Sequence, residues 1–88
     1  MPRGAPKARL VADLPEAGWE AVSSSNLEAV LYKAADQVLL IRFKSGAVYA
    51  YAEVPRRVYD GLMNADSKGK FHHNSIKGHY PFAGPLAG

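Results

Sequence analysis

The sequence contains no cysteine and no long run of aliphatic residues. Without cysteine the chain cannot form disulfide bonds, cysteine nucleophiles, thiolate zinc sites or cysteine-ligated iron–sulfur clusters. The longest aliphatic run covers residues 38–41, far short of the roughly 18 residues that a transmembrane helix needs. The basic N-terminal stretch has no apolar segment after it, which argues against a secretory signal. We therefore expect a soluble, cytoplasmic protein that does not contact a membrane.

Acidic residues are absent from the last quarter of the chain, after Asp66. Residues 67–80 contain three lysines and three histidines, and residues 1–9 contain three basic residues and no acid. The intervening residues 10–66 have five basic and eight acidic side chains, so the net charge of +3 comes from the two ends. This polarised charge suggests an anionic partner. The alternative is a solvated tail and a solvated helix surface.

The length of 88 residues allows one small domain, too short for a dinucleotide-binding domain with a substrate lobe or for a (β/α)₈ barrel. Prolines and glycines with little periodicity predict a mobile or loosely docked arm over residues 1–18 and a C-terminal tail over 83–88. The folded unit should therefore cover about residues 19–82.

Strand-forming segments occupy the first half of this unit, at residues 26–32, 38–44 and 47–53. The first is less distinct, because leucine, glutamate and alanine also suit a helix. Short links between the three segments predict an antiparallel meander.

The pattern then becomes helical. Pro55 suits the first position of a helix over residues 55–64, and Ser67 can cap a second helix over 68–77 that Gly78 ends. The predicted fold is therefore α+β: a small three-stranded antiparallel meander followed by two short helices packed on one face, in the order βββαα.

The length of the second hairpin loop decides which face of the sheet Tyr49 and Tyr51 occupy. A two-residue loop would place the tyrosines on the face away from Leu39, Ile41 and Phe43. A three-residue loop would place them on the same face as those three side chains. The three-residue loop, 44–46, needs a positive φ only at Gly46, so we favour it. Both tyrosines then line the core facing the helices. The opposite face then carries Leu40, Arg42, Lys44, Val48, Ala50 and Ala52.

Several short segments between residues 22 and 80 occur in the order of a known family. They are Val22-Ser23-Ser24, Tyr32, Phe43-Lys44-Ser45-Gly46, Tyr49-Ala50-Tyr51, Val54-Pro55, Tyr59, Leu62, Ser67-Lys68-Gly69-Lys70-Phe71, Asn74, Ile76 and Tyr80. This series resembles the KTSC domain, a short module found at the C-terminus of some lysyl-tRNA synthetases and as small stand-alone bacterial proteins. The pair His72-His73 departs from the family's pattern, in which an aromatic residue followed by asparagine is more usual, and the basic N-terminal arm is extra. The family has no established activity; the resemblance implies a non-enzymatic module and suggests RNA binding.

No grouping of residues predicts catalysis or a metal site. His72 and His73 are adjacent on a predicted helix and so point about 100° apart, which makes shared chelation of one metal difficult. No carboxylate follows Asp66 to orient a histidine, and neither a nucleophile elbow nor a glycine-rich phosphate loop is present. We expect no enzyme activity, no metal, no cofactor and no small-molecule substrate.

Basic and aromatic side chains instead predict a nucleic-acid-binding module, with RNA as the expected partner. The segment 68–70 begins the second helix with two lysines and free backbone N–H groups, which suits a phosphate; the alternative is that Ser67 only caps and the lysines are solvated. Tyr49 and Tyr51 could stack on bases if the two-residue loop held. The predicted nucleic-acid-binding residues are Lys68, Lys70, Lys77, His72, His73, Arg42, Lys44, Tyr49 and Tyr51.

A second hypothesis is a protein-interaction module, or a small regulator or inhibitor that docks on a larger enzyme. It would use an edge strand or the sheet face formed by Leu40, Val48, Ala50 and Ala52. This hypothesis predicts an exposed apolar patch on that face, whereas RNA binding predicts a continuous positive surface that includes Lys68, Lys70 and Lys77.

Overall fold

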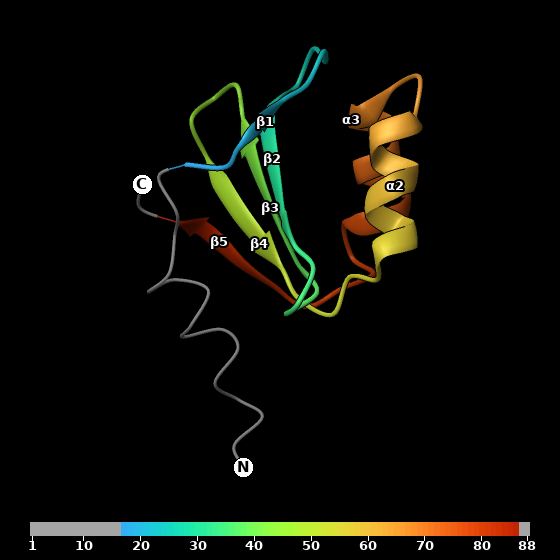
Figure 1. Cartoon of the computed structure of the whole chain (residues 1–88). Coiled ribbons are helices and arrows are strands. Elements are labelled where there is room, and N and C mark those ends of the chain that lie inside the picture. Colours follow the sequence, from blue (N-terminus) through green and yellow to red (C-terminus); the bar gives the residue numbers. More distant parts are fainter. Residues whose placement is uncertain (1–16, 87–88) are drawn as a thin grey trace.

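A computed structural model of the chain describes residues 17–86. The predicted N-terminal arm therefore lies almost entirely outside the described residues. The described part is one five-stranded antiparallel sheet with two helical segments on one side of it (Figure 1). Within residues 17–86, no helix is long and apolar enough to cross a membrane.

The five strands follow one another in both sequence and space, in the order β1-β2-β3-β4-β5. Every neighbouring pair is antiparallel. The strands are β1 (Glu20–Ala21), β2 (Leu27–Lys33), β3 (Val38–Phe43), β4 (Val48–Tyr51) and β5 (Phe82–Leu86). The central three confirm the predicted meander with small shifts of their ends.

The prediction of three strands is incomplete, because β1 and β5 extend the sheet on both sides. The strand β5 returns after the helices and pairs with β4, so that Ala83 faces Ala50 and Phe82 faces Tyr51. The predicted C-terminal tail over 83–88 was therefore wrong for residues 83–86, which belong to the sheet. Backbone pairing with β4 holds this segment in the sheet. Its small residues and its proline do not by themselves suggest a strand.

The β3–β4 hairpin has the three-residue loop that the glycine position favoured. The N–H of Phe43 donates to the Ala47 carbonyl at 2.8 Å, and Gly46 has a φ of +99°. Tyr49 therefore pairs with Ile41 and Tyr51 with Leu39. Because paired residues point to the same side of a sheet, both tyrosines face the helices, as predicted.

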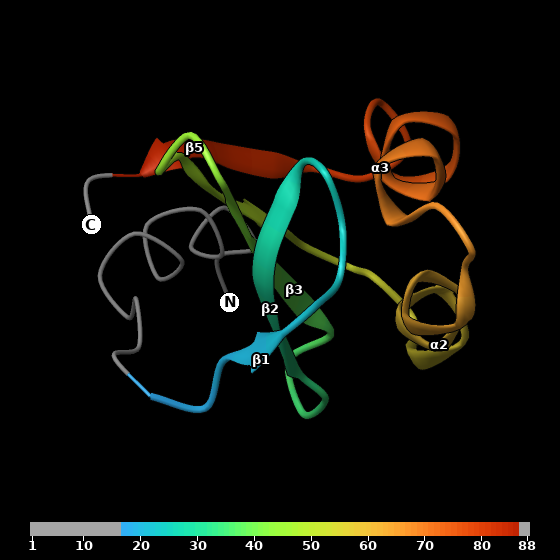
Figure 2. The same ribbon diagram turned by 90° about the horizontal axis from the view of Figure 1, so that it is seen from above.

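The helical part lies between β4 and β5 in the chain and contains α2 (Arg56–Asn64), α3 (Lys68–Phe71) and a π-helical turn, η1 (His72–Ile76). The Ser67 hydroxyl caps α3 by accepting from the Lys70 N–H at 3.3 Å, as expected. The predicted second helix is continuous but changes to π geometry at His72, where the Lys77 N–H donates to the His72 carbonyl five residues back, at 2.8 Å. Seen from above, α2 and α3 lie on the same side of the sheet (Figure 2).

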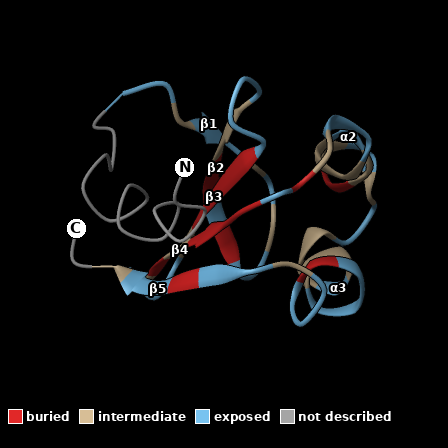
Figure 3. Cartoon of the chain, turned by 90° about the horizontal axis from the view of Figure 1, so that it is seen from below, coloured by how far each residue is buried: buried red, intermediate tan, exposed pale blue. Residues whose placement is uncertain are grey.

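Each side of the sheet has its own apolar cluster, and buried positions concentrate along the strands (Figure 3). The cluster on the helix side consists of Leu27, Val30, Leu39, Ile41, Tyr51, Val54, Leu62 and Ile76. The cluster on the other side consists of Val38, Leu40, Ala50, Ala52 and Ala83, with Trp19, Leu31 and Leu86 packed against it. The second face is therefore not the open apolar surface that the protein-interaction hypothesis predicted: Leu40 and Ala50 are at most 1% exposed.

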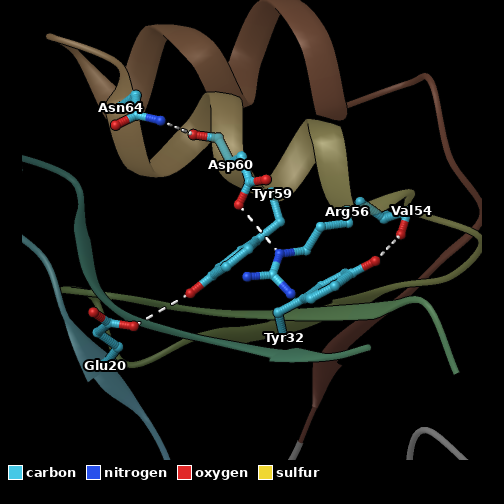
Figure 4. Close-up of polar contacts among 7 residues, drawn as sticks. All are labelled: Glu20, Tyr32, Val54, Arg56, Tyr59, Asp60 and Asn64. Carbon is cyan, nitrogen blue, oxygen red and sulfur yellow. Dashed lines mark hydrogen bonds and ion pairs between the residues drawn. The ribbon is translucent and has the colours of Figure 1, made fainter. Parts of the chain in front are cut away.

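A group of aromatic and polar side chains attaches α2 to the sheet (Figure 4). The rings of Tyr32 on β2 and Tyr59 on α2 stack with centroids 4.8 Å apart. The Tyr32 hydroxyl donates to the Val54 carbonyl at 2.6 Å, and the Tyr59 hydroxyl donates to the Glu20 carboxylate at 3.2 Å. The contacts join β1, β2 and α2, so this group has a structural role.

Candidate nucleic-acid interface

A cavity of about 790 Å³ opens between the β3–β4 hairpin, the π-helical turn and the start of β5. Its lining residues are Ser25, Asn26, Phe43, Lys44, Ser45, Ala47, Tyr49, Tyr51, His72, Lys77, Gly78 and Phe82. They come from four separate parts of the chain, which the meander and the returning strand β5 bring together. We call this feature the aromatic cavity.

Five rings form much of the wall of the aromatic cavity. Tyr49 and Tyr51 project from the same face of β4 with ring centroids 6.4 Å apart. Phe82 on β5 lies 6.0 Å from the Tyr49 ring and 6.1 Å from the Tyr51 ring. Phe43 lies edge-on to Tyr49 at 5.8 Å and to His72 at 5.1 Å. The edge-on contacts of Phe43 have one of the favoured geometries of aromatic pairs.

The polar wall of the cavity is the pair Tyr51 and His72, whose hydroxyl oxygen and Nε2 are 2.7 Å apart. Burial raises the pKa of Tyr51 to about 12, with a smaller contribution from Tyr49. Burial also lowers the pKa of His72 below its usual 6.5, and the positive charges of Lys77 and His73 add to that effect. Both groups are therefore uncharged at neutral pH. Either the Tyr51 hydroxyl donates to Nε2 or a protonated Nε2 donates to the hydroxyl oxygen, according to which ring nitrogen of His72 carries the proton.

Positive charge reaches the cavity from Lys44 in the hairpin loop and from Lys77 at the end of the π-helical turn. Both lysines are exposed, and no carboxylate is among the lining residues. The π-helical turn ends in a backbone hydrogen bond from the Lys77 N–H to the His72 carbonyl. Both of these residues line the cavity, so the π geometry helps to shape it. Such turns often occur at functional sites.

Gly84 allows the ring of Tyr49 to lie directly against β5. A Cβ atom at this position would be 2.7 Å from Cδ2 of Tyr49 and 3.0 Å from the Val48 carbonyl oxygen. The residue also has a φ of +152°, which residues other than glycine rarely adopt. Glycine at this position therefore sets the place of one wall of the cavity.

The KTSC domain family model matches residues 23–80, which is most of the described chain. The chain belongs to the KTSC domain family. The resemblance noted in the sequence is thereby confirmed.

A crystal structure of a KTSC domain protein from Yersinia pestis has the same fold as this KTSC domain. It superimposes with a TM-score of 0.74 at 33% identity, over 80% of this chain and 96% of that one. A protein from Tsukamurella paurometabola is 46% identical over 56 residues, which cover 64% of this chain and 84% of that protein.

Lysine–tRNA ligases also contain a stretch similar to this KTSC domain. The ligase of a Nostoc species is 40% identical over 58 residues, which cover 66% of this chain. The match covers only 10% of the ligase. It therefore concerns one small part of a much larger enzyme.

The aromatic cavity brings together five of the residues predicted to bind nucleic acid: Lys44, Tyr49, Tyr51, His72 and Lys77. The other four do not line it. Arg42 is on the opposite face of the sheet, where its guanidinium carbon lies 4.3 Å from the centroid of the Trp19 ring. The three-residue loop predicted this face for Arg42, so Arg42 cannot contribute to the same surface as Tyr49 and Tyr51.

The predicted phosphate site at the start of the second helix has some of its polar groups engaged within this KTSC domain. The Lys68 ammonium donates to the Ala65 carbonyl at 3.2 Å, and the Lys70 N–H donates to the Ser67 hydroxyl. Among the four residues outside the cavity, Lys70 and His73 are exposed, whereas Arg42 and Lys68 are partly buried.

Sequence reasoning missed Phe82 and the turn residues Ser25 and Asn26. Phe82 was assigned to the end of the domain, although a phenylalanine between proline and alanine near the C-terminus could have indicated an aromatic contact. Ser25 and Asn26 carry no signal in the sequence alone, because only the folded sheet brings them beside the hairpin loop. Among residues 17–86, no three histidine, aspartate or glutamate side chains gather where they could hold a metal ion.

Proposed function

We propose that this KTSC domain is a non-enzymatic RNA-binding module whose binding surface is the aromatic cavity with Lys44 and Lys77. The observation that supports the proposal is the combination, in one cavity, of five rings and two lysines with no acidic lining residue. Aromatic rings stack on unpaired bases, and lysines contact phosphates, which are the two usual means by which proteins hold single-stranded RNA.

The charge of this surface comes from its lysines and not from its histidine. The lowered pKa of His72 keeps the imidazole neutral at pH 7, so His72 does not supply the positive charge that the sequence predicted for a phosphate contact. Lys44 and Lys77 supply that charge instead. With so few cations, binding should be weak, and it should weaken further as salt is added with a slope set by the small number of phosphates neutralised. His72 instead supplies an uncharged, hydrogen-bonding wall.

The relatives give this proposal a context. Lysine–tRNA ligases, whose name states a tRNA substrate, contain a segment similar to this chain. A module attached to a larger RNA-binding protein gains from its high effective concentration near the RNA, which compensates for weak intrinsic affinity. An RNA partner also accords with the cytoplasmic location expected from the sequence.

The alternative, a protein-interaction module, has less support. The apolar face that it would use is buried, with Val48 at 3% and Ala52 at 7% exposure. The edge strands are β1, which has two residues, and β5, in which Pro85 lacks a backbone donor. Neither edge offers a long row of free backbone groups for an added strand.

The experiment is an amide chemical-shift titration of the labelled protein with mixed-sequence single-stranded RNA, first at low and then at physiological salt. We expect shifts in residues 43–51 and 72–82 that diminish as salt is added. Shifts confined to residues 66–70 would place binding at the start of α3 instead. The absence of shifts at low salt would contradict RNA binding altogether.

A further inference from the structure

We infer that the aromatic cavity is a site for a single unpaired nucleotide, whose base packs against Phe82 and Tyr49 while its phosphate contacts Lys77 or Lys44. This inference deepens the proposed function and rests on it. It adds what the cavity recognises: one planar ring and one anionic group joined together. The inference depends on the exposure of Phe82, the size of the cavity and its charge.

Phe82 is the one large hydrophobic side chain of residues 17–86 that is strongly exposed, at 47%. It is exposed at the cavity and not on the outer surface of the sheet, with its ring tilted by 39° to the Tyr49 ring. An exposed aromatic ring beside other rings gains free energy when a ligand removes it from water. A flat, apolar ligand surface is what this wall would bind.

The size of the cavity limits that ligand to a small one. Its volume of about 790 Å³ is within the range of roughly 300–1,000 Å³ typical of small-molecule and cofactor sites. A base with its sugar and phosphate fits such a space. A duplex does not, because its bases already stack on their neighbours and present only their edges.

The charge of the lining distinguishes an anionic ligand from a cationic one. A group of aromatic rings by itself could also hold an organic cation. Two lysines and no carboxylate line this cavity, so a cation would meet repulsion without compensation. A simple phosphate would need the lysines but not the rings. The ligand that uses both is a nucleotide.

A planar base joined to a phosphate occurs both in a free nucleotide and in an unpaired residue of RNA. The test separates these two ligands. The unlabelled protein is mixed at low salt with adenosine monophosphate, with a short single-stranded oligoadenylate, and with a ribose–phosphate chain of the same length that has no bases. Proton NMR records the base resonances, and calorimetry gives each affinity. Aromatic rings that stack on a base shift its protons upfield, which is a direct sign of contact.

We expect upfield shifts of the adenine protons, and an affinity for oligoadenylate that exceeds the affinity for the baseless chain roughly five- to 150-fold. Phe82→Leu removes one of the two rings that pack against the base, so it should reduce both the upfield shifts and this difference in affinity. Phe82→Tyr, which keeps the ring, should retain both. Because Phe82 is half exposed, neither substitution should prevent folding.

The other outcomes separate the inference from the proposed function. Equal affinity for oligoadenylate and the baseless chain would overturn the nucleotide site while leaving RNA binding through phosphates intact. Affinity for adenosine monophosphate equal to that for oligoadenylate would support the site but contradict RNA as its ligand. Failure of all three probes to bind would overturn both.

Discussion

The hydroxyl oxygen of Tyr51 lies 2.7 Å from Nε2 of His72, and this contact joins β4 to the π-helical turn across one wall of the aromatic cavity. The two residues are 21 positions apart in the chain. Their rings also pack edge-on at 5.6 Å, and Phe43 packs edge-on to His72 at 5.1 Å. The pair therefore fixes the helical segment against the sheet and defines the polar side of the cavity.

The lowered pKa of His72 predicts that the protein loses stability in mild acid. Below its ordinary pKa of 6.5 the histidine binds a proton in the unfolded chain, whereas the folded protein resists protonation until its own, lower pKa is reached. The free energy of unfolding should therefore fall as the pH decreases from about 6.5 through the folded pKa. Urea unfolding between pH 7.5 and 5 measures this, and His72→Gln should flatten the dependence. An identical slope in the variant would contradict the role of His72.

The raised pKa of Tyr51 predicts a second loss of stability in strong base. The unfolded chain releases this proton near the ordinary value of 10, and the folded protein keeps it to about 12. The stabilisation is therefore complete below pH 10 and is lost as the pH rises from 10 to 12. Tyrosinate absorbance during alkaline titration should contain a late component near pH 12 that Tyr51→Phe removes. A late component that persists in the variant would assign it to another tyrosine.

Gly84 should be more sensitive to alanine than Gly46, although both have a positive φ. A Cβ atom at Gly46 meets nothing within 4 Å, so Gly46→Ala should cost only the backbone strain of about 1–2 kcal/mol. Gly84→Ala adds contacts of 2.7 Å and 2.9 Å with the Tyr49 ring, so it should cost more. Thermal and urea unfolding of both variants test this. Equal losses would mean that Tyr49 moves freely away from β5.

The salt dependence of RNA binding should identify the lysines that contact phosphates. For single strands, the logarithm of the affinity falls against the logarithm of salt concentration by about 0.7 for each neutralised phosphate. Lys77→Gln should therefore reduce the slope by about 0.7. Lys33→Gln removes a lysine that does not line the cavity, and it should leave the slope unchanged. A reduction of the slope in the control would indicate nonspecific attraction by net charge.

Much of the central fold follows from local sequence signals. Gly46 determined the hairpin loop and hence the side on which Tyr49 and Tyr51 lie, and Ser67 indicated the start of the second helix. The strand β5 did not follow from the sequence, because Phe82–Leu86 has little alternation and depends on pairing with β4. The cavity was missed for the same reason: four separate segments form it, and no local pattern reports their proximity. Lys44 was assigned to the wrong surface, because it lies in the loop, where strand alternation ends.

The measurement that most directly tests whether the aromatic cavity binds RNA compares two charge-reversal variants. One combines Lys44→Glu with Lys77→Glu, and the other combines Lys68→Glu with Lys70→Glu, so both change the net charge equally. We expect the first variant to lose binding of single-stranded RNA at low salt, with nearly unchanged melting temperature, and the second to lose much less. Loss in the second variant with retention in the first would contradict binding at the cavity and place the phosphate site at the start of α3.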